Sequence, residues 1–159
     1  MGTKEILFQA IREYDLDLIT KILKEDISLL NSKDNRGYNP LLLASYYGYE
    51  DIVDFILELD PMIDDKDTSG NTALMGVCFK GFENIAVKLI NAGANVNETN
   101  NCGATALIYA ASFNRPSMVK LLLERGADHT IADIRGNTAT LHAKIQGLKE
   151  ILALLEKIY

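Results

Sequence analysis

Two histidines, His129 and His142, are the imidazole side chains that could act as general bases in this chain of 159 residues. Catalysis would require such a base beside a nucleophile and an orienting group. His129 follows the end of a predicted helix, where a loop residue is expected, and His142 lies near the C-terminus on a helix where we expect it to be a polar capping residue. We therefore predict no catalytic residues and a protein that is not an enzyme.

Metal and cofactor chemistry is also not predicted. The two cysteines, Cys78 and Cys102, lack the spacing to histidine that zinc sites use. The chain has neither a Walker phosphate loop nor a dinucleotide-binding glycine fingerprint. A small acidic cluster at positions 64, 65 and 67 is interrupted by Lys66 and lacks the ligand spacing of an EF-hand, so a solvated turn is expected. We predict no metal site and no cofactor.

Charge and hydropathy limit the partners. The net charge is −6, whereas a nucleic-acid partner would require a basic stripe. The apolar residues of the first twenty positions are interrupted by Gln9, Arg12 and Asp15, unlike a signal peptide, and no apolar run approaches the roughly 18 residues of a membrane span. We predict no nucleic-acid partner, no membrane association, a monomer when alone, and the reducing cytoplasm as its location.

The elements that position these side chains repeat every 33 residues. Glycines mark one column of the repeat at positions 37, 70, 103 and 136, and a second column at 48, 81 and 147, where Asn114 takes the third position in place of glycine. The repeat predicts a single domain of five units, 1–33, 34–66, 67–99, 100–132 and 133–159. In the first unit, Phe8 is aligned with Leu41 and Arg12 with Ser45. Charged residues in buried columns at both ends predict capping units and a complete array.

Within a unit the pattern is turn, helix, loop, helix. Asn39 and the threonines at 72, 105 and 138 stand two residues after the first glycine, where they can cap a helix. Pro40 then suits the first helical position, and the second-column Gly or Asn suits the left-handed end of that helix. Cys78 replaces small residues and should be buried, whereas Cys102 should lie in an exposed turn. Because Leu59-Asp60-Pro61 replaces Gly-Ala, the second helix of unit 34–66 is expected to end differently.

The motifs GNTAL (70–74), GATAL (103–107), NAGANVN (91–97) and ERGAD (124–128) resemble the ankyrin repeat. The family's frequent histidine after the leucine is replaced at 42, 75, 108 and 141. The resemblance implies an all-α solenoid of helix–loop–helix units joined by β-turn or hairpin loops at right angles to the helices. It also matches Asn97 to an asparagine that is hydroxylated in some eukaryotic members, although a hydrogen bond within its own turn is a sufficient role.

The resemblance further implies that a protein or peptide partner binds the concave face, which the hairpins and first helices form. In four of the five units, at least one of the two residues before the second-column position is aromatic, and binding hot spots are enriched in aromatics. The predicted partner-binding residues are Tyr14, Arg36, Tyr38, Tyr46, Tyr47, Phe79, Lys80 and Phe113. Tyr109 is expected to belong to the core.

The function predicted is a non-enzymatic interaction module acting as an adaptor, an inhibitor or an immunity-type neutraliser. The alternatives are an enzyme or small-ligand protein with an unrecognised site between repeats, favoured by a deep pocket of convergent polar groups, and a structural spacer, which predicts no aromatic strip.

Overall fold

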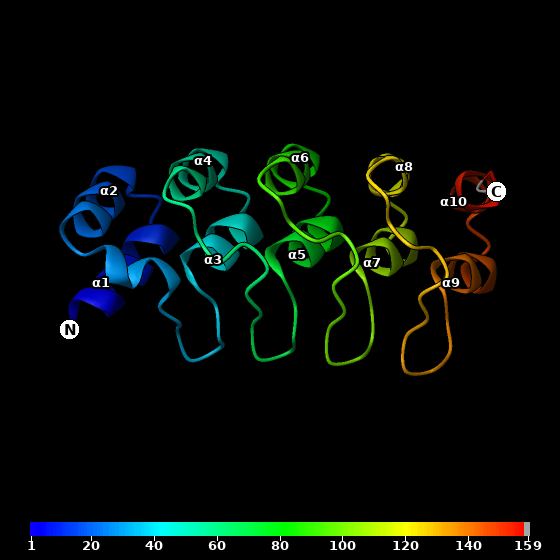
Figure 1. Cartoon of the computed structure of the whole chain (residues 1–159), viewed down its shortest axis with the longest axis horizontal. Helices are drawn as coiled ribbons and strands as arrows, with labels where there is room; N and C mark the ends of the chain where they lie inside the picture. Colours follow the sequence, from blue (N-terminus) through cyan, green and yellow to red (C-terminus); the bar gives the residue numbers. More distant parts are fainter. Residues whose placement is uncertain (158–159) are drawn as a thin grey trace.

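A computed structural model describes residues 1–157, which form ten α-helices and one short 3-10 helix and contain no β-strand. The helices are α1 (Thr3–Arg12), α2 (Leu16–Glu25), η1 (Ile27–Asn31), α3 (Pro40–Tyr47), α4 (Glu50–Glu58), α5 (Ala73–Lys80), α6 (Glu83–Asn91), α7 (Ala106–Ser112), α8 (Pro116–Glu124), α9 (Ala139–Gln146) and α10 (Lys149–Glu156). Figure 1 shows two rows: α1, α3, α5, α7 and α9 form an inner row, and α2, α4, α6, α8 and α10 an outer row. Hairpin loops extend from the inner row, away from the outer one (Figure 1). This arrangement is the predicted all-α repeat solenoid.

Side-chain caps begin the inner helices after the first. Asn39 accepts a hydrogen bond from the Leu42 N–H at 2.8 Å, and Thr72 accepts one from the Met75 N–H at 3.3 Å. Thr105 and Thr138 make the equivalent bonds. Each bond satisfies a backbone donor that the first helical turn leaves without a partner. The predicted caps are therefore confirmed.

The core lies between the two rows and between neighbouring inner helices. Small residues such as Ala44, Cys78 and Ala111 have no exposed surface, so the inner helices pack closely against one another. Apolar side chains of the outer helices, including Ile52 and Leu89, close the core from the other side. Because burial of apolar area is the main favourable term in folding, stacking of the units stabilises each one.

The hairpins of successive units contact each other at their tips. The backbone N–H of Thr68 donates to the Arg36 carbonyl at 3.1 Å, and equivalent bonds join the following hairpins. Gly37 has φ 77°, and a Cβ there would lie 2.8 Å from the Thr68 nitrogen. Only glycine fits both the conformation and the approach.

The second helix of unit 34–66 ends differently, as predicted, in one respect. The N–H groups of Ala94 and Ala127 donate to the Leu89 and Leu122 carbonyls, whereas Pro61 at the same position has no N–H to donate. The backbone conformation before it is nevertheless kept. Asp60 adopts the left-handed conformation at φ 56°, as Gly93 and Gly126 do in later units. Aspartate enters this region more readily than most residues because its short polar side chain can form local hydrogen bonds.

The alignment of the first unit is wrong, by one residue. The Asp15 N–H bonds the Ala10 carbonyl as the Tyr49 N–H bonds the Ala44 carbonyl. Leu7, not Phe8, therefore corresponds to Leu41, and a fully buried Ile11 replaces Arg12 in the Ser45 column. The charged residues assigned to buried columns at the N-terminal end do not occupy them.

Across residues 1–157, no helix combines the length and the apolar character that crossing a bilayer requires.

Candidate functional site

Tyrosines at the end of α3 form a cluster of aromatic rings that includes Tyr38 of the preceding hairpin. The rings of Tyr38 and Tyr46 stack with centroids 6.2 Å apart, and Tyr47 meets Tyr46 edge-on at 6.5 Å. Tyr47 in turn stacks on Tyr49 at 5.3 Å. Tyr46 and Tyr47 keep 38% and 43% of their surface exposed. These contacts fix the ring orientations but leave large aromatic areas accessible.

A second aromatic cluster joins α5 to α7. Phe79 and Phe113 meet edge-on with centroids 4.5 Å apart, and Tyr109 contacts both of them. Phe113 is 46% exposed, whereas Phe79 and Tyr109 are half-buried. The structure thus brings Phe79 and Phe113 together, as predicted, and adds Tyr109, which had been assigned to the core.

Tyr14 stands at a helix corner, not at the end of a helix like Tyr46 and Tyr47, and its ring is linked to Tyr47 through Tyr49. It has φ 60° and takes the place of the left-handed glycine at the corner between α1 and α2. Its hydroxyl donates to Asp51 at 2.8 Å, a hydrogen bond that raises the Tyr14 pKa, and its ring packs edge-on against Tyr49. The one-residue shift in the first unit causes this difference.

The two basic residues of the predicted site occupy different places. Arg36 is exposed at a hairpin tip and helps line a groove pocket of about 570 Å³ near the N-terminus, together with Arg12 and the tyrosines of α3. Lys80 is exposed at the end of α5, and its Nζ lies 4.7 Å from the centroid of the Tyr46 ring. This distance is typical of a cation–π contact.

A smaller pocket of about 250 Å³ separates the two aromatic clusters. Its walls include Tyr38, Tyr46, Phe79 and Tyr109, and its base includes Gly76 of α5. The pocket exists because Gly76 has no side chain where Tyr109 and His142 stand in later units. The sequence signal was present, since a glycine in the middle of a predicted helix is unusual and requires a reason.

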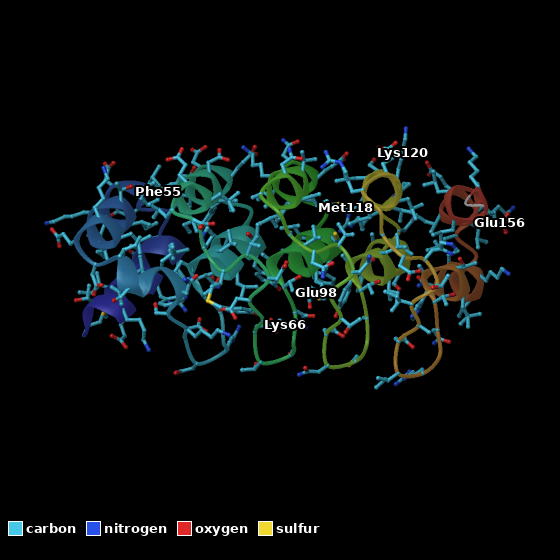
Figure 2. The ribbon with its side chains drawn as sticks, in the orientation of Figure 1. Phe55, Lys66, Glu98, Met118, Lys120 and Glu156 are labelled. Atoms are coloured by element: carbon cyan, nitrogen blue, oxygen red, sulfur yellow. The ribbon has the colours of Figure 1, made fainter. Side chains whose placement is uncertain are left out.

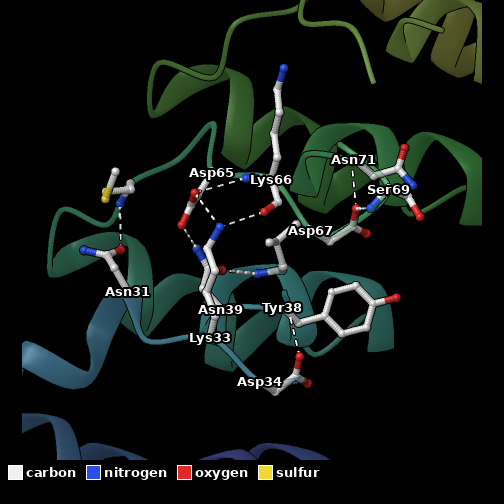
Figure 3. Close-up of polar contacts among 12 residues, drawn as sticks. Asn31, Lys33, Asp34, Tyr38, Asn39, Asp65, Lys66, Asp67, Ser69 and Asn71 are labelled. Atoms are coloured by element: carbon white, nitrogen blue, oxygen red, sulfur yellow. Dashed lines mark hydrogen bonds and ion pairs between the residues drawn. The ribbon is translucent and has the colours of Figure 1, made fainter. Parts of the chain in front are cut away.

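Polar groups line the hairpin side of this pocket. Asp67 Oδ1 accepts the backbone N–H groups of Ser69 and Asn71, both at 2.9 Å. Figure 3 shows these bonds beside the Tyr38 ring. Burial raises the Tyr38 pKa, and the negative charge of Asp67 raises it further. The lining residues combine one carboxylate with aromatic and amide groups and include neither histidine nor cysteine.

The two histidines and the two cysteines lie outside the lining of this pocket. His142 lies on the last inner helix, α9, and its Nε2 is 2.8 Å from Asp133 Oδ2, as expected for a polar residue of a capping unit. His129 is half-buried in the turn after α8. Cys78 is buried and Cys102 exposed, as predicted. Within the part of the chain that the structure describes, no three acidic, His or Cys side chains gather as a metal site would need.

Asn97 bonds a neighbouring unit rather than its own turn. Its Oδ1 accepts the Asp128 N–H at 2.7 Å, and its Nδ2 donates to the Gly126 carbonyl at 3.4 Å. The expected bond within the turn is therefore corrected to one that joins two units.

Capped helix pairs, hairpins joined at their tips and a groove along one side define a repeat protein of the ankyrin class. Family models described as ankyrin repeats match residues 36–67 and 59–133, together more than half of the chain. The chain belongs to the ankyrin-repeat family. Over 62 residues it is 44% identical to "Protein fem-1 homolog C" of Homo sapiens and of Bos taurus, and 40% identical to that of Xenopus laevis. These matches cover 36% of this chain and 10% of each relative, so the chain matches about a tenth of its relatives' length.

Proposed function

We propose that this protein is a non-enzymatic interaction module that binds a protein or peptide segment in its concave groove. Ankyrin repeats generally mediate protein–protein interactions, and the net charge of −6 disfavours a nucleic-acid partner. The proposal makes the protein an adaptor, an inhibitor or an immunity-type neutraliser, according to the partner that it binds.

The observation that carries the proposal is the pair of exposed aromatic clusters on either side of the Gly76 pocket. Rings that served packing alone would be covered, yet Tyr46, Tyr47 and Phe113 each leave more than a third of their surface open. Aromatic side chains already held in place by neighbours lose little entropy when a partner covers them. A partner lying along the groove would contact both clusters and the pocket between them.

Selection from a displayed library of random peptides, followed by titration of the selected segments, tests this proposal. Tyr46→Ala and Phe113→Ala should each weaken binding by roughly 2 kcal/mol, about thirtyfold, as expected for groove anchors. Phe79→Ala should also weaken binding, but because its ring is half-buried the substitution should lower stability as well. Tyr46→Ala is therefore the cleaner test.

The matched control is Lys120→Ala. Lys120 is exposed on α8 in the outer row, on the side away from the hairpins (Figure 2), and its removal should leave binding unchanged. Melting curves for every variant separate lost binding from lost folding. Selected segments that bind Tyr46→Ala and Phe113→Ala as tightly as the original protein would refute the groove assignment.

A further inference from the structure

One position of the repeat pairs with the hairpin in the last two units. It lies nine residues after the Asp or Asn that begins each hairpin, namely Asp34, Asp67, Asn100 and Asp133. In the fourth unit, Asn100 Nδ2 donates to the Tyr109 hydroxyl at 2.9 Å. In the fifth, His142 Nε2 lies 2.8 Å from Asp133 Oδ2. The hairpin side chain is thus satisfied by the inner helix of its own unit.

The second unit satisfies the same carboxylate in another way. Leu43 stands at the pairing position and offers no polar atom, but Arg12 of α1 reaches Asp34 Oδ2 at 3.3 Å. The repeat therefore provides two cases, Arg12–Asp34 and His142–Asp133, in which this carboxylate pairs with a basic side chain.

In the third unit the corresponding carboxylate is Asp67, and it has no basic partner among the described residues. Gly76 occupies the pairing position. Asp67 is half-buried beside the Gly76 pocket. Its charge is among the causes, after burial, that raise the pKa values of both Tyr38 and Tyr109. Asp67 lines this pocket together with both tyrosines.

We propose that the Gly76 pocket receives an arginine side chain of the bound segment, with Asp67 as its counter-ion and Tyr38, Tyr46 and Phe79 as its aromatic walls. The inference rests on the proposed function and names the side chain that the groove selects. The partner's guanidinium takes the place that Arg12 takes at Asp34 in the preceding unit.

Arginine suits this pocket better than lysine for two reasons. Its planar guanidinium is weakly hydrated and stacks on aromatic faces, whereas an ammonium is compact and strongly hydrated. Lys80 already holds an ammonium over the Tyr46 ring, which shows that this ring accepts a cation. Asp67 adds an N–H acceptor at the hairpin side, so an arginine can stack and donate at the same time.

The test uses a blocked pentapeptide of four glycines around one central arginine, with counterparts that carry citrulline or lysine instead. Citrulline keeps the planar shape and removes the charge. In amide NMR titrations of the full chain, the arginine peptide should shift the signals of Ser69, Asn71 and Gly76. It should bind roughly tenfold more tightly than the citrulline peptide, as expected for charge-assisted hydrogen bonds, and more tightly than the lysine peptide.

Two substitutions assign the effect to the pocket. Asp67→Asn should abolish the preference for arginine over citrulline while the hairpin persists, because Asn100 in the next unit accepts the equivalent backbone N–H groups at 3.0 and 2.9 Å. Gly76→His should reduce arginine binding strongly, because it supplies Asp67 with the internal partner that Asp133 has in His142. Melting curves establish that each variant is folded.

Equal binding of the arginine and citrulline peptides would overturn the proposal, as would an arginine preference that survives Asp67→Asn. The proposed function fails separately. If selected segments still lose binding to Tyr46→Ala, the groove function stands while the arginine subsite falls. If those segments bind the ring variants normally, the groove function itself falls.

Discussion

Replacing Gly76 with alanine should stabilise the protein, although it changes a residue at the centre of the proposed site. Gly76 lies in the interior of α5 and is not among the residues with positive φ. A Cβ there would meet one atom within 4 Å, Tyr46 Cδ2 at 3.9 Å, which is an ordinary contact. Glycine in a helix interior costs about 1 kcal/mol relative to alanine. Gly76→Ala should therefore raise the free energy of unfolding by about 1 kcal/mol, and the melting temperature by roughly 2–4 °C for a domain of this size.

Gly48→Ala is the matched control because it makes the same chemical change where the structure forbids it. Gly48 has φ 75°, and a Cβ would lie 2.9 Å from Cζ of Phe82. The left-handed conformation alone costs a non-glycine residue about 1–2 kcal/mol, so this variant should be less stable. Urea unfolding followed by circular dichroism measures both changes. If Gly76→Ala were destabilising, or Gly48→Ala stabilising, the reasoning from φ and local space would be refuted. A stabilised Gly76→Ala that binds arginine peptides more weakly would show that the glycine keeps the pocket open at the expense of stability.

Two further predictions follow from the surroundings of titratable groups. Burial raises the pKa of the Cys78 thiol and shields it, so a thiol reagent at pH 8 should modify Cys102 rapidly and Cys78 only after denaturation; equal rates in the native protein would contradict this. At Asp133, burial alone would raise the pKa, but hydrogen bonds from the Asn137 backbone and His142 outweigh it and lower the pKa below 3.8. A lowered folded-state pKa contributes stability above the ordinary value, and this stability is lost as the pH falls through the folded pKa. The stability difference between the original protein and Asp133→Asn should therefore shrink between pH 5 and pH 2.5, whereas a constant difference would count against the assignment.

Local regularities made most of the fold predictable from the sequence. A cap such as Thr72 and a left-handed residue such as Gly81 or Asn114 act within a few positions of themselves, so their types and spacing indicate where each helix begins and ends. The same reasoning predicted a buried Cys78, because its column holds small residues in other units. It also predicted a different end for the second helix of unit 34–66, where Pro61 lacks the N–H that Ala94 and Ala127 donate, although Asp60 keeps the left-handed conformation of the later glycines.

The arrangement of the candidate site was predictable only in part, because a residue's column indicates its face but not its neighbours. Tyr46, Tyr47, Phe79 and Phe113 were identified from their column and form two clusters. Tyr14 corresponds to Gly48 and not to Tyr47, because the first unit departs by one residue from the period that the other units keep. A shift of one position on a helix turns a side chain by about 100°, and at the end of α1 it places Tyr14 at the left-handed corner position.

By itself, the sequence determined the repeat, the caps, the turn glycines and the class of protein, since each depends on short-range sterics and hydrogen bonds repeated at a constant spacing. Only the tertiary structure decided which side chains meet across units. The Gly76 pocket has walls from three successive units, including Tyr38, Phe79 and Tyr109, and the Asp67 carboxylate stands at its edge. Its existence depends on the distance between stacked helices and on a side chain that one unit lacks. Contacts between residues about thirty positions apart arise from packing, so periodicity alone could not specify them.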